Sequence, residues 1–184
     1  DGNTDQVEVD VNLVDGTTKK VIDDYNLRGL KRDETTIVKS ADGLTTSTSW
    51  DLNGDGVIDQ TRKETVVNRG NGDIIDTLTD YNSSNALIQN AVVTTSDNGH
   101  LKDLQWDTNG DGVVDHTETT RTLVDGSATT TAIDYTVDAT THARTLKTTT
   151  STSISADGHT KTVLVTNAAD GFVSHKEVAS TLVD

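Results

Sequence analysis

Turn-forming residues recur along this chain in a fixed order and at a nearly constant period, and this restricts the possible folds more than any other feature. Trp50 and Trp106 are separated by 56 positions, and Trp106 and Val165 by 59. In each of three units a Gly precedes a Tyr by nine positions. We therefore interpret the chain as consecutive copies of one unit, the third with a five-residue insertion between its Tyr and its next turn.

The unit boundaries follow two Asp-rich segments. We predict a first repeat, truncated at its start, over residues 1–50, a second over 51–106, a third over 107–165, and the start of a degenerate fourth over 166–184. The first sixteen residues align without a gap on residues 111–126, and the Thr-Leu-Val-Asp at the end repeats residues 122–125. We expect the chain to be a segment of a longer array.

Each unit has the pattern of β-structure and lacks the periodicity of helices. Segments of about seven to ten residues, rich in Thr, Val and Ile, are separated by Asn-Gly, Asp-Gly and Ser-rich turns. Because such short turns join only antiparallel neighbours, we predict an all-β fold: tandem repeats of a four-stranded antiparallel meander in a linear array. Propeller-blade-like units are the alternative, although three units are fewer than the roughly four blades that a closed propeller needs.

Composition argues against a thick core and against several partners. Only 32% of the residues are hydrophobic, and the net charge of −15 repels nucleic acids and anionic lipid surfaces. No Cys is present, so disulfides, zinc thiolate sites and a cysteine nucleophile are excluded. A bound metal is the expected source of additional stability.

Two segments have the composition of calcium loops: DLNGDGVID over residues 51–59 and DTNGDGVVD over residues 107–115. Oxygen-bearing side chains at positions 1, 3, 5 and 9, with Gly at position 6, suit Ca²⁺, whereas Mg²⁺ demands a tighter octahedral shell. We expect the position-8 residues Ile58 and Val114 to point inward. The predicted ligands are the side chains of Asp51, Asn53, Asp55 and Asp59 with the Val57 carbonyl, and those of Asp107, Asn109, Asp111 and Asp115 with the Val113 carbonyl.

These segments resemble the calcium loops of EF-hands, dockerins and FG-GAP repeats, and position 12 separates the possibilities. Glu118 fits the EF-hand pattern in the second loop, but Arg62 at the same position of the first loop does not bind a cation. A loop between two strands, as in FG-GAP repeats, is therefore favoured, and coordination by Glu118 stays open. The competing interpretation is that the Asp-Gly and Asn-Gly pairs only make tight turns.

Two further copies are incomplete. Asp1, Asn3 and Asp5 correspond to the last part of a loop and form at most a partial site. In the fourth copy the ligand positions hold Thr166, Ala168, Asp170 and Ser174, which leaves one carboxylate. We expect that copy to bind no metal.

The whole chain, with its D-x-N-G-D-G-x-x-D loops, T-D-Y-N turns and S-A-D-G turns, resembles the Thr-rich repeat regions of giant RTX-type (haemolysin-type) calcium-binding proteins that bacteria secrete. The resemblance implies an exported protein found outside the cell or on its surface. No tandem G-G-x-G-x-D run is present, so the parallel β-roll of the RTX nonapeptides is not implied.

The leading hypothesis is a calcium-stabilised structural segment, stalk-like or adhesin-like, whose partners are calcium ions and neighbouring repeats of the same chain. The alternative is a calcium-dependent polysaccharide-binding module that uses the Tyr and Trp rings. Because the rings recur at equivalent points of the units, we expect instead that each packs on the thin core of its own unit. We expect no enzymatic activity, because no G-x-S-x-G, P-loop or H-E-x-x-H motif occurs and the five His residues form no close pair at ligand spacing.

Overall fold

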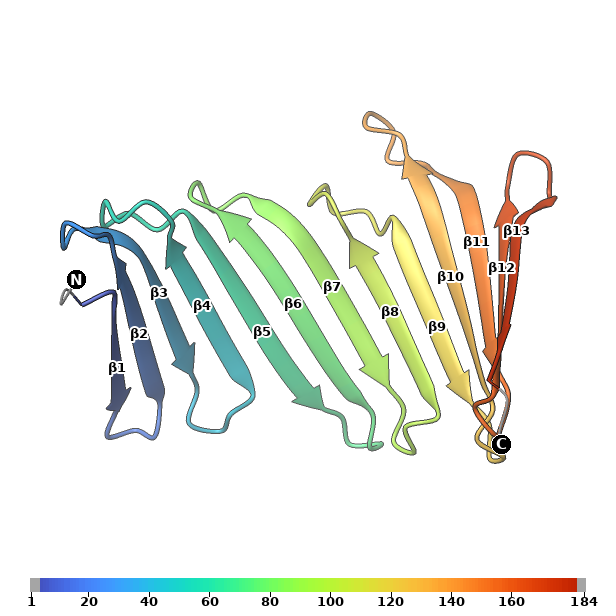
Figure 1. The fold of residues 1–184 in the computed structure, drawn as a ribbon, viewed down its shortest axis with the longest axis horizontal. Coiled ribbons are helices and arrows are strands. Elements are labelled where there is room, and N and C mark those ends of the chain that lie inside the picture. Colours follow the sequence, from blue (N-terminus) through green and yellow to red (C-terminus); the bar gives the residue numbers. More distant parts are fainter. Residues whose placement is uncertain (1–3, 182–184) are drawn as a thin grey trace. The chain divides into compact units, whose positions relative to one another are not determined.

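The computed structural model describes residues 4–181, which form β-strands joined by turns and loops (Figure 1). No helix in this range is long and apolar enough to cross a membrane. Within it lie thirteen strands: β1 Gln6–Asn12, β2 Thr18–Tyr25, β3 Lys31–Lys39, β4 Thr45–Asp51, β5 Gln60–Asn68, β6 Ile74–Asn82, β7 Leu87–Thr95, β8 Leu101–Asp107, β9 His116–Thr122, β10 Ala128–Val137, β11 Arg144–Ile154, β12 Thr160–Asn167 and β13 Val173–Ser180.

The turns form where the Gly, Asp and Ser clusters predict them. Between β3 and β4, the Gly43 N–H donates to the Ser40 carbonyl at 2.9 Å, and the Ser40 hydroxyl donates to the Asp42 carboxylate at 2.6 Å. Gly43 has φ +72°, a left-handed conformation that glycine adopts without steric cost. The turns that begin at Ser96 and Ser155 have the same backbone hydrogen bond, because the sequence repeats Ser and Gly at the same spacing.

Each strand pairs with its neighbours in the sequence, in the order β1 to β13, to form one open antiparallel sheet. The predicted all-β antiparallel meander is therefore confirmed, and separate propeller blades are not found among the described strands. Four strands, β5 to β8, lie between the two Asp-rich loops, and four more, β9 to β12, follow the second loop. The connections between consecutive strands are too short for any other pairing.

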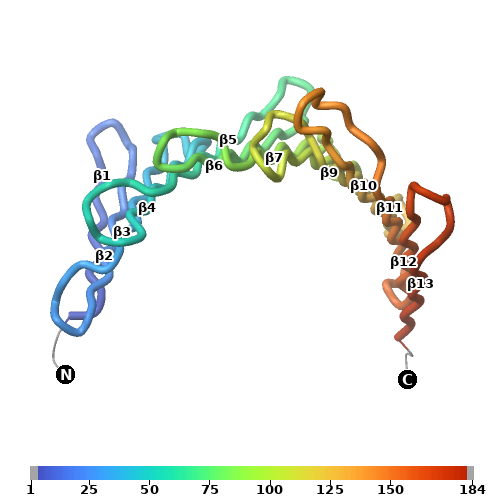
Figure 2. Tube along the Cα trace, turned by 90° about the horizontal axis from the view of Figure 1, so that it is seen from above, coloured from blue at the N-terminus to red at the C-terminus, as the bar shows by residue number. Residues whose placement is uncertain are grey.

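The described residues divide into two compact units. The first comprises residues 4–67 and 76–90, and the second comprises residues 68–75 and 91–181. Within each unit the strands lie in a single layer, and no described element covers either face of that layer (Figure 2). Both faces of the sheet are therefore open to water.

Because there is only one layer, no hydrophobic side chain among the described residues is buried. The buried residues in this range are three aspartates, Asp51, Asp80 and Asp107. The sequence-based expectation of a thin apolar core is therefore wrong. The inward position expected for Ile58 is also wrong, since this side chain is 39% exposed, and Val114 is half-buried. Cohesion comes from backbone ladders, β-branched cross-strand neighbours and polar clusters.

Among the strand pairs whose register is described, three contain a β-bulge, in which one strand carries an extra residue. Between β2 and β3 the extra residue is Arg32, opposite the Asp24–Tyr25 step. Between β10 and β11 it is Lys147, opposite the Asp134–Tyr135 step. Between β12 and β13 it is Ser174. Each extra residue lies within the first four residues of its strand, close to the connection that precedes that strand.

Candidate metal centre

Loop 1, residues 51–59, connects β4 to β5. Asp51 is the last residue of β4, and the loop is closed by the Asp59 N–H, which donates to the Trp50 carbonyl at 2.8 Å. Gly54 and Gly56 have φ of +72° and +85°, left-handed conformations that glycine adopts without steric cost. The glycines at positions 4 and 6 of the motif therefore serve the backbone path of the loop.

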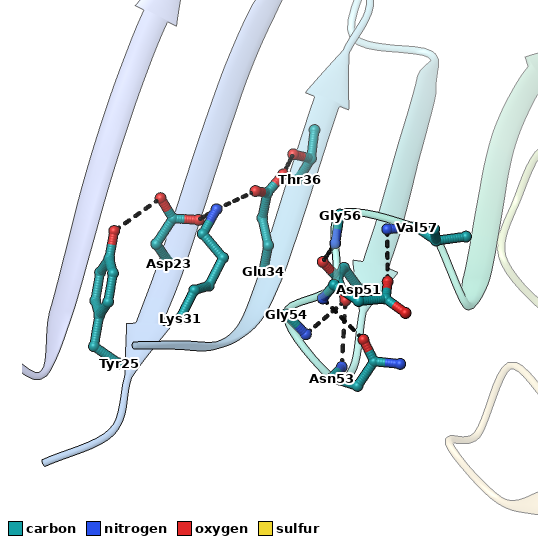
Figure 3. A network of polar contacts seen from close by, with 11 residues as sticks. Asp23, Tyr25, Lys31, Glu34, Thr36, Asp51, Asn53, Gly54, Gly56 and Val57 are labelled. Atoms are coloured by element: carbon teal, nitrogen blue, oxygen red, sulfur yellow. Dashed lines mark hydrogen bonds and ion pairs between the residues drawn. The ribbon is translucent and has the colours of Figure 1, made fainter. Parts of the chain in front are cut away.

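The Asp51 carboxylate lies at the centre of loop 1 and is only 2% exposed (Figure 3). Its Oδ1 accepts hydrogen bonds from the N–H groups of Gly54 at 2.7 Å and Asn53 at 3.3 Å. Its Oδ2 accepts one from the Gly56 N–H at 2.8 Å. Burial raises the pKa of this carboxyl, but the N–H groups of Gly56, Gly54 and Asn53 together lower it more, so the pKa lies below its usual value.

The other predicted side-chain ligands of loop 1 accept hydrogen bonds from the loop backbone. Asn53 Oδ1 accepts from the Asp55 N–H at 2.9 Å, and Asp55 Oδ1 accepts from the Val57 N–H at 2.8 Å. Asp59 Oδ2 accepts from the Leu52 N–H at 2.8 Å. The second carboxylate oxygens of Asp55 and Asp59 accept no hydrogen bond from the described residues. These two oxygens remain available to a cation.

Loop 2, residues 107–115, connects β8 to β9 and repeats this arrangement. Asp107 is 4% exposed and accepts from the Gly110 N–H at 2.7 Å and the Gly112 N–H at 2.8 Å. Asn109 Oδ1 accepts from the Asp111 N–H at 2.9 Å. Asp111 Oδ1 in turn accepts from the N–H of the residue at position 7, Val113, at 2.8 Å. The two loops thus fold alike because the Asp and Asn at positions 1, 3 and 5 each capture an N–H two to five residues ahead, while the Asp at position 9 captures the N–H of position 2.

Loop 2 differs from loop 1 at two ligand positions. The Asn109 amide nitrogen donates to Asp111 Oδ2 at 3.2 Å, and both Asp115 oxygens accept from Thr108. The Thr108 hydroxyl adds a bond to Asp115 Oδ2 at 2.7 Å. Position 2 of loop 1 is Leu52, which has no hydroxyl. The carboxylate oxygens of loop 2 are therefore more fully hydrogen-bonded than those of loop 1.

The donor types in both loops fit a hard cation. Each offers three carboxylates, one amide oxygen and one main-chain carbonyl at position 7, which are the ligands that Ca²⁺ prefers. Among residues 4–181, however, no group of three or more His, Cys, Asp or Glu side chains is placed so that it could hold a metal ion. The side chains instead satisfy the N–H groups of their own loop. Both loops are thus turns closed by their own hydrogen bonds, and their residues at positions 3 and 5 are exposed to solvent.

Position 12 has different roles after the two loops. Arg62 lies in β5 and binds Asp80 of β6: its Nε is 2.8 Å from Oδ1 and its Nη2 is 2.8 Å from Oδ2. Glu118 lies in β9, and its described hydrogen bond is a 3.5 Å contact from the Thr120 hydroxyl. Within the described residues, Glu118 forms no hydrogen bond with loop 2.

Each incomplete copy retains one contact of the complete loops: the Asp5 carbonyl is bound as the Asp115 carbonyl is, and Asp170 accepts from the N–H two residues ahead as Asp55 does. Asp1 and Asn3 lie outside the described residues, and the Asp5 carbonyl accepts a hydrogen bond from the Tyr25 N–H at 2.8 Å. In the fourth copy, Asp170 accepts from the Phe172 N–H at 3.0 Å. Thr166 and Ala168 supply no carboxylate at the preceding ligand positions, and the position-9 residue is the bulge residue of β13.

Loop 1 packs against the backbone of the first residues of β3. A Cβ atom on Gly54 would lie 2.5 Å from the Lys31 carbonyl oxygen, so only glycine allows this approach. The Lys31 Nζ bridges Asp23 at 2.7 Å and Glu34 at 2.6 Å (Figure 3). The hydrogen bonds to Asp23 and then to Glu34 raise the pKa of Lys31, in spite of partial burial. This ion-pair cluster fixes the strand on which the loop rests.

The sequence analysis missed the third buried carboxylate of the described residues, that of Asp80, which is 1% exposed. Besides both Arg62 contacts, it accepts a hydrogen bond from Gln89 Nε2 at 2.7 Å. The hydrogen bonds from Arg62 lower the pKa of Asp80; burial opposes them, and Gln89 reinforces them. The sequence does contain a signal for this residue, because an Asp directly precedes each recurring Tyr, at positions 24, 80 and 134.

Three of the aromatic rings contact polar side chains of the same compact unit. The Arg62 guanidinium lies 5.8 Å from the centroid of the Trp50 ring, and the Arg144 guanidinium lies 3.8 Å from that of Tyr135. Trp106 contacts His116 edge to face, with centroids 6.1 Å apart. The predicted packing of rings on an apolar core is therefore replaced by contacts with cationic and polar side chains.

A scan against protein-family models found no match to this chain, and a search of curated proteins found none either.

Proposed function

We propose that this chain is a calcium-stabilised structural segment, stalk-like or adhesin-like, of a large bacterial protein that is secreted or exposed on the cell surface. The observation that carries the proposal is the arrangement of the two Asp-rich loops. In each, a buried position-1 carboxylate is oriented by N–H groups at positions 4 and 6, while the oxygens of positions 3 and 5 are held by the N–H groups two residues ahead.

The sheet provides a physical reason for a metal. A single layer without a buried apolar side chain among its described residues lacks the usual source of stability. The chain also carries a net charge of −15, and each loop concentrates three carboxylates within nine residues. A divalent cation offsets this repulsion and links positions at both ends of the loop, which fixes the angle between the two flanking strands.

The expected contribution is a substantial part of the about 5 to 15 kcal/mol by which folded domains are usually stable. Calcium sites of extracellular modules bind with dissociation constants of about 10⁻⁴ to 10⁻³ M. A site with calcium at about 100 times its dissociation constant stabilises the folded state by about 2.7 kcal/mol. Such weak sites suit a protein outside the cell, so that the segment is rigid there and softer where calcium is scarce.

Terbium luminescence tests the proposal directly, because Trp50 and Trp106 immediately precede the loops and sensitise a lanthanide bound there. We expect two sites that calcium displaces. Asp55→Ala should remove the site in loop 1, and Asp111→Ala should remove the site in loop 2. Asp170→Ala, in the fourth copy with its single carboxylate, is the matched control and should leave both.

Two results would contradict the calcium proposal. One is the absence of sensitised luminescence that calcium displaces, in protein whose far-ultraviolet circular dichroism shows an intact sheet. The other is an unchanged number of sites in Asp55→Ala and Asp111→Ala. In that case the loops are metal-free turns that the Asp and Asn hydrogen bonds alone hold closed.

A further inference from the structure

Two surface pockets are lined by residues at corresponding positions of the sequence. Residues 5–25 align without a gap on residues 115–135. The Arg32 pocket, in the first unit, is lined by Asp5, Gln6, Asp24, Tyr25 and Arg32, among others. The Lys147 pocket, in the second unit, is lined by Asp115, His116, Asp134, Tyr135 and Lys147, together with Trp106. One set of side-chain types is thus brought together twice.

The β-bulges account for the cation in each pocket. Arg32 and Lys147 are the extra residues of their bulges, each opposite an Asp-Tyr step of the neighbouring strand. A bulge turns the side chain of its extra residue away from the regular alternation of the strand. The positive charge is therefore placed beside the Asp and the Tyr by the backbone, whether that residue is Arg or Lys.

A neighbouring side chain orients the strand Asp in both pockets. Asp24 Oδ1 accepts a hydrogen bond from Gln6 Nε2 at 2.9 Å, and Arg32 Nη2 lies 3.8 Å from Asp24 Oδ2. In the Lys147 pocket, His116 Nδ1 lies 2.7 Å from Asp134 Oδ1.

The oriented Asp134 is still accessible. The Thr148 hydroxyl donates to its Oδ2 at 2.7 Å, and its side chain remains 47% exposed. Each carboxylate oxygen carries two lone pairs, so the strand Asp retains capacity to accept a further hydroxyl.

The charges and the rings identify the class of ligand. Each pocket combines one strand carboxylate and one cation with a second carboxylate, Asp5 or Asp115, and both Asp115 oxygens already accept from Thr108. The strand carboxylate and the net charge of −15 disfavour an anionic ligand. Carboxylates accept hydrogen bonds from hydroxyls, the cation donates to ring and hydroxyl oxygens, and the face of an aromatic ring packs against C–H groups. At Tyr135 the Arg144 guanidinium already lies over one face, 3.8 Å from the ring centroid, so a sugar would pack against the opposite face. The pocket volumes, about 670 and 380 Å³, accommodate one or two sugar rings. We propose that the Arg32 and Lys147 pockets bind neutral hexose units of a polysaccharide.

The strand pair β6–β7 serves as an internal control. It has the same Asp-Tyr step at Asp80 and Tyr81, but Ile88 occupies the sequence position of Arg32 and Lys147. Asp80 is buried, and Arg62 and Gln89 occupy its two oxygens. The acid beside Tyr81 is therefore inaccessible and the Arg62 cation is already paired with it, so we expect no sugar binding there.

The first test applies the intact 184-residue chain, in calcium-containing buffer, to an array of immobilised neutral, uronate-bearing and phosphorylated oligosaccharides. The neutral hexasaccharide that binds best on the array is then titrated into the chain by calorimetry. We expect binding to neutral glycans, with two sites per chain. Tyr25→Ala and Tyr135→Ala should each weaken one site about tenfold, the loss expected for one ring contact. Arg32→Met and Lys147→Met retain the aliphatic stems and should weaken the same sites.

Tyr81→Ala is the matched control and should leave both sites intact. Circular dichroism of each variant identifies any that fails to fold, and the Met variants keep the proposal testable if a Tyr variant does. The proposal is overturned if no neutral glycan binds, if only anionic glycans bind, or if Tyr81→Ala weakens binding as much as Tyr135→Ala. Terbium titration of Lys147→Met separates this proposal from the calcium proposal, because that variant should keep both metal sites.

Discussion

Replacement of Arg62 by Met tests whether a buried ion pair takes over the role of a core in this sheet. Met keeps most of the aliphatic length of Arg62 but removes the guanidinium, which binds both oxygens of Asp80 at 2.8 Å. Asp80 is 1% exposed and would retain one described partner, Gln89 Nε2 at 2.7 Å. The variant therefore leaves a buried carboxylate without its counter-charge.

The magnitude follows from the burial of the two partners. Removal of one member of a fully buried pair costs about 3 to 5 kcal/mol. Arg62 is 39% exposed, so solvent screens part of the attraction, and the bond from Gln89 stays. We expect Arg62→Met to lower the free energy of unfolding by about 2 to 3 kcal/mol. The double variant Arg62→Met/Asp80→Leu should recover most of this loss, because no charge is then left buried.

Urea unfolding at neutral pH, followed by circular dichroism and by the fluorescence of Trp50, measures both variants. Trp50 lies 5.8 Å from the Arg62 guanidinium and therefore reports on this part of the sheet. The reasoning is refuted if Arg62→Met unfolds within about 0.5 kcal/mol of the parent chain, the usual range of surface substitutions. A double variant that is less stable than Arg62→Met would refute it equally.

Two further predictions concern acid and the loop glycines. The pKa of Asp80 is lowered from 3.8 in the folded state, so its ion pair stabilises the fold fully above pH 3.8 and is lost as the pH falls through the lower folded-state pKa. The urea midpoint should therefore fall as the pH is lowered from about 5 to about 2. Arg62→Met should make the urea midpoint less dependent on pH in this range. Gly54→Ala should cost about 2 to 3 kcal/mol, since its Cβ would meet the Lys31 carbonyl oxygen at 2.5 Å in addition to φ +72°. Gly56→Ala, with open space around its Cβ and only the strain of φ +85°, should cost about 1 kcal/mol; equal melting temperatures for the two would show that the approach to β3 is unimportant.

The strands and turns were predictable because their causes are local. Alternating β-branched residues favour extended backbone, and turns such as the one at Ser40 close through hydrogen bonds within five residues. The antiparallel order followed as well, since connections of a few residues leave no other partner for each strand. The likeness between the two Asp-rich loops was also readable, because every side-chain contact that shapes them falls within a loop.

The buried carboxylate of Asp80 was not predictable, because its partner Arg62 is eighteen positions away on the neighbouring strand. The corresponding Asp134 has His116 and Thr148 instead, although both acids precede a Tyr at the same point of the unit. Which side chains face each other across the sheet depends on strand register and on where a bulge adds a residue. Sequence periodicity alone does not specify either of these.

The sequence by itself determined the class of fold, the order of the strands and the oxygen-rich chemistry of the two loops, since each depends on residues that are close together in the chain. Only the tertiary structure decided that the sheet is one layer thick, and that its described buried side chains are acids rather than hydrophobic groups. The physical reason is that burial is a property of what packs against a face. With water on both faces of the layer, only a carboxylate enclosed by donors from its own loop or from adjacent strands is fully removed from solvent.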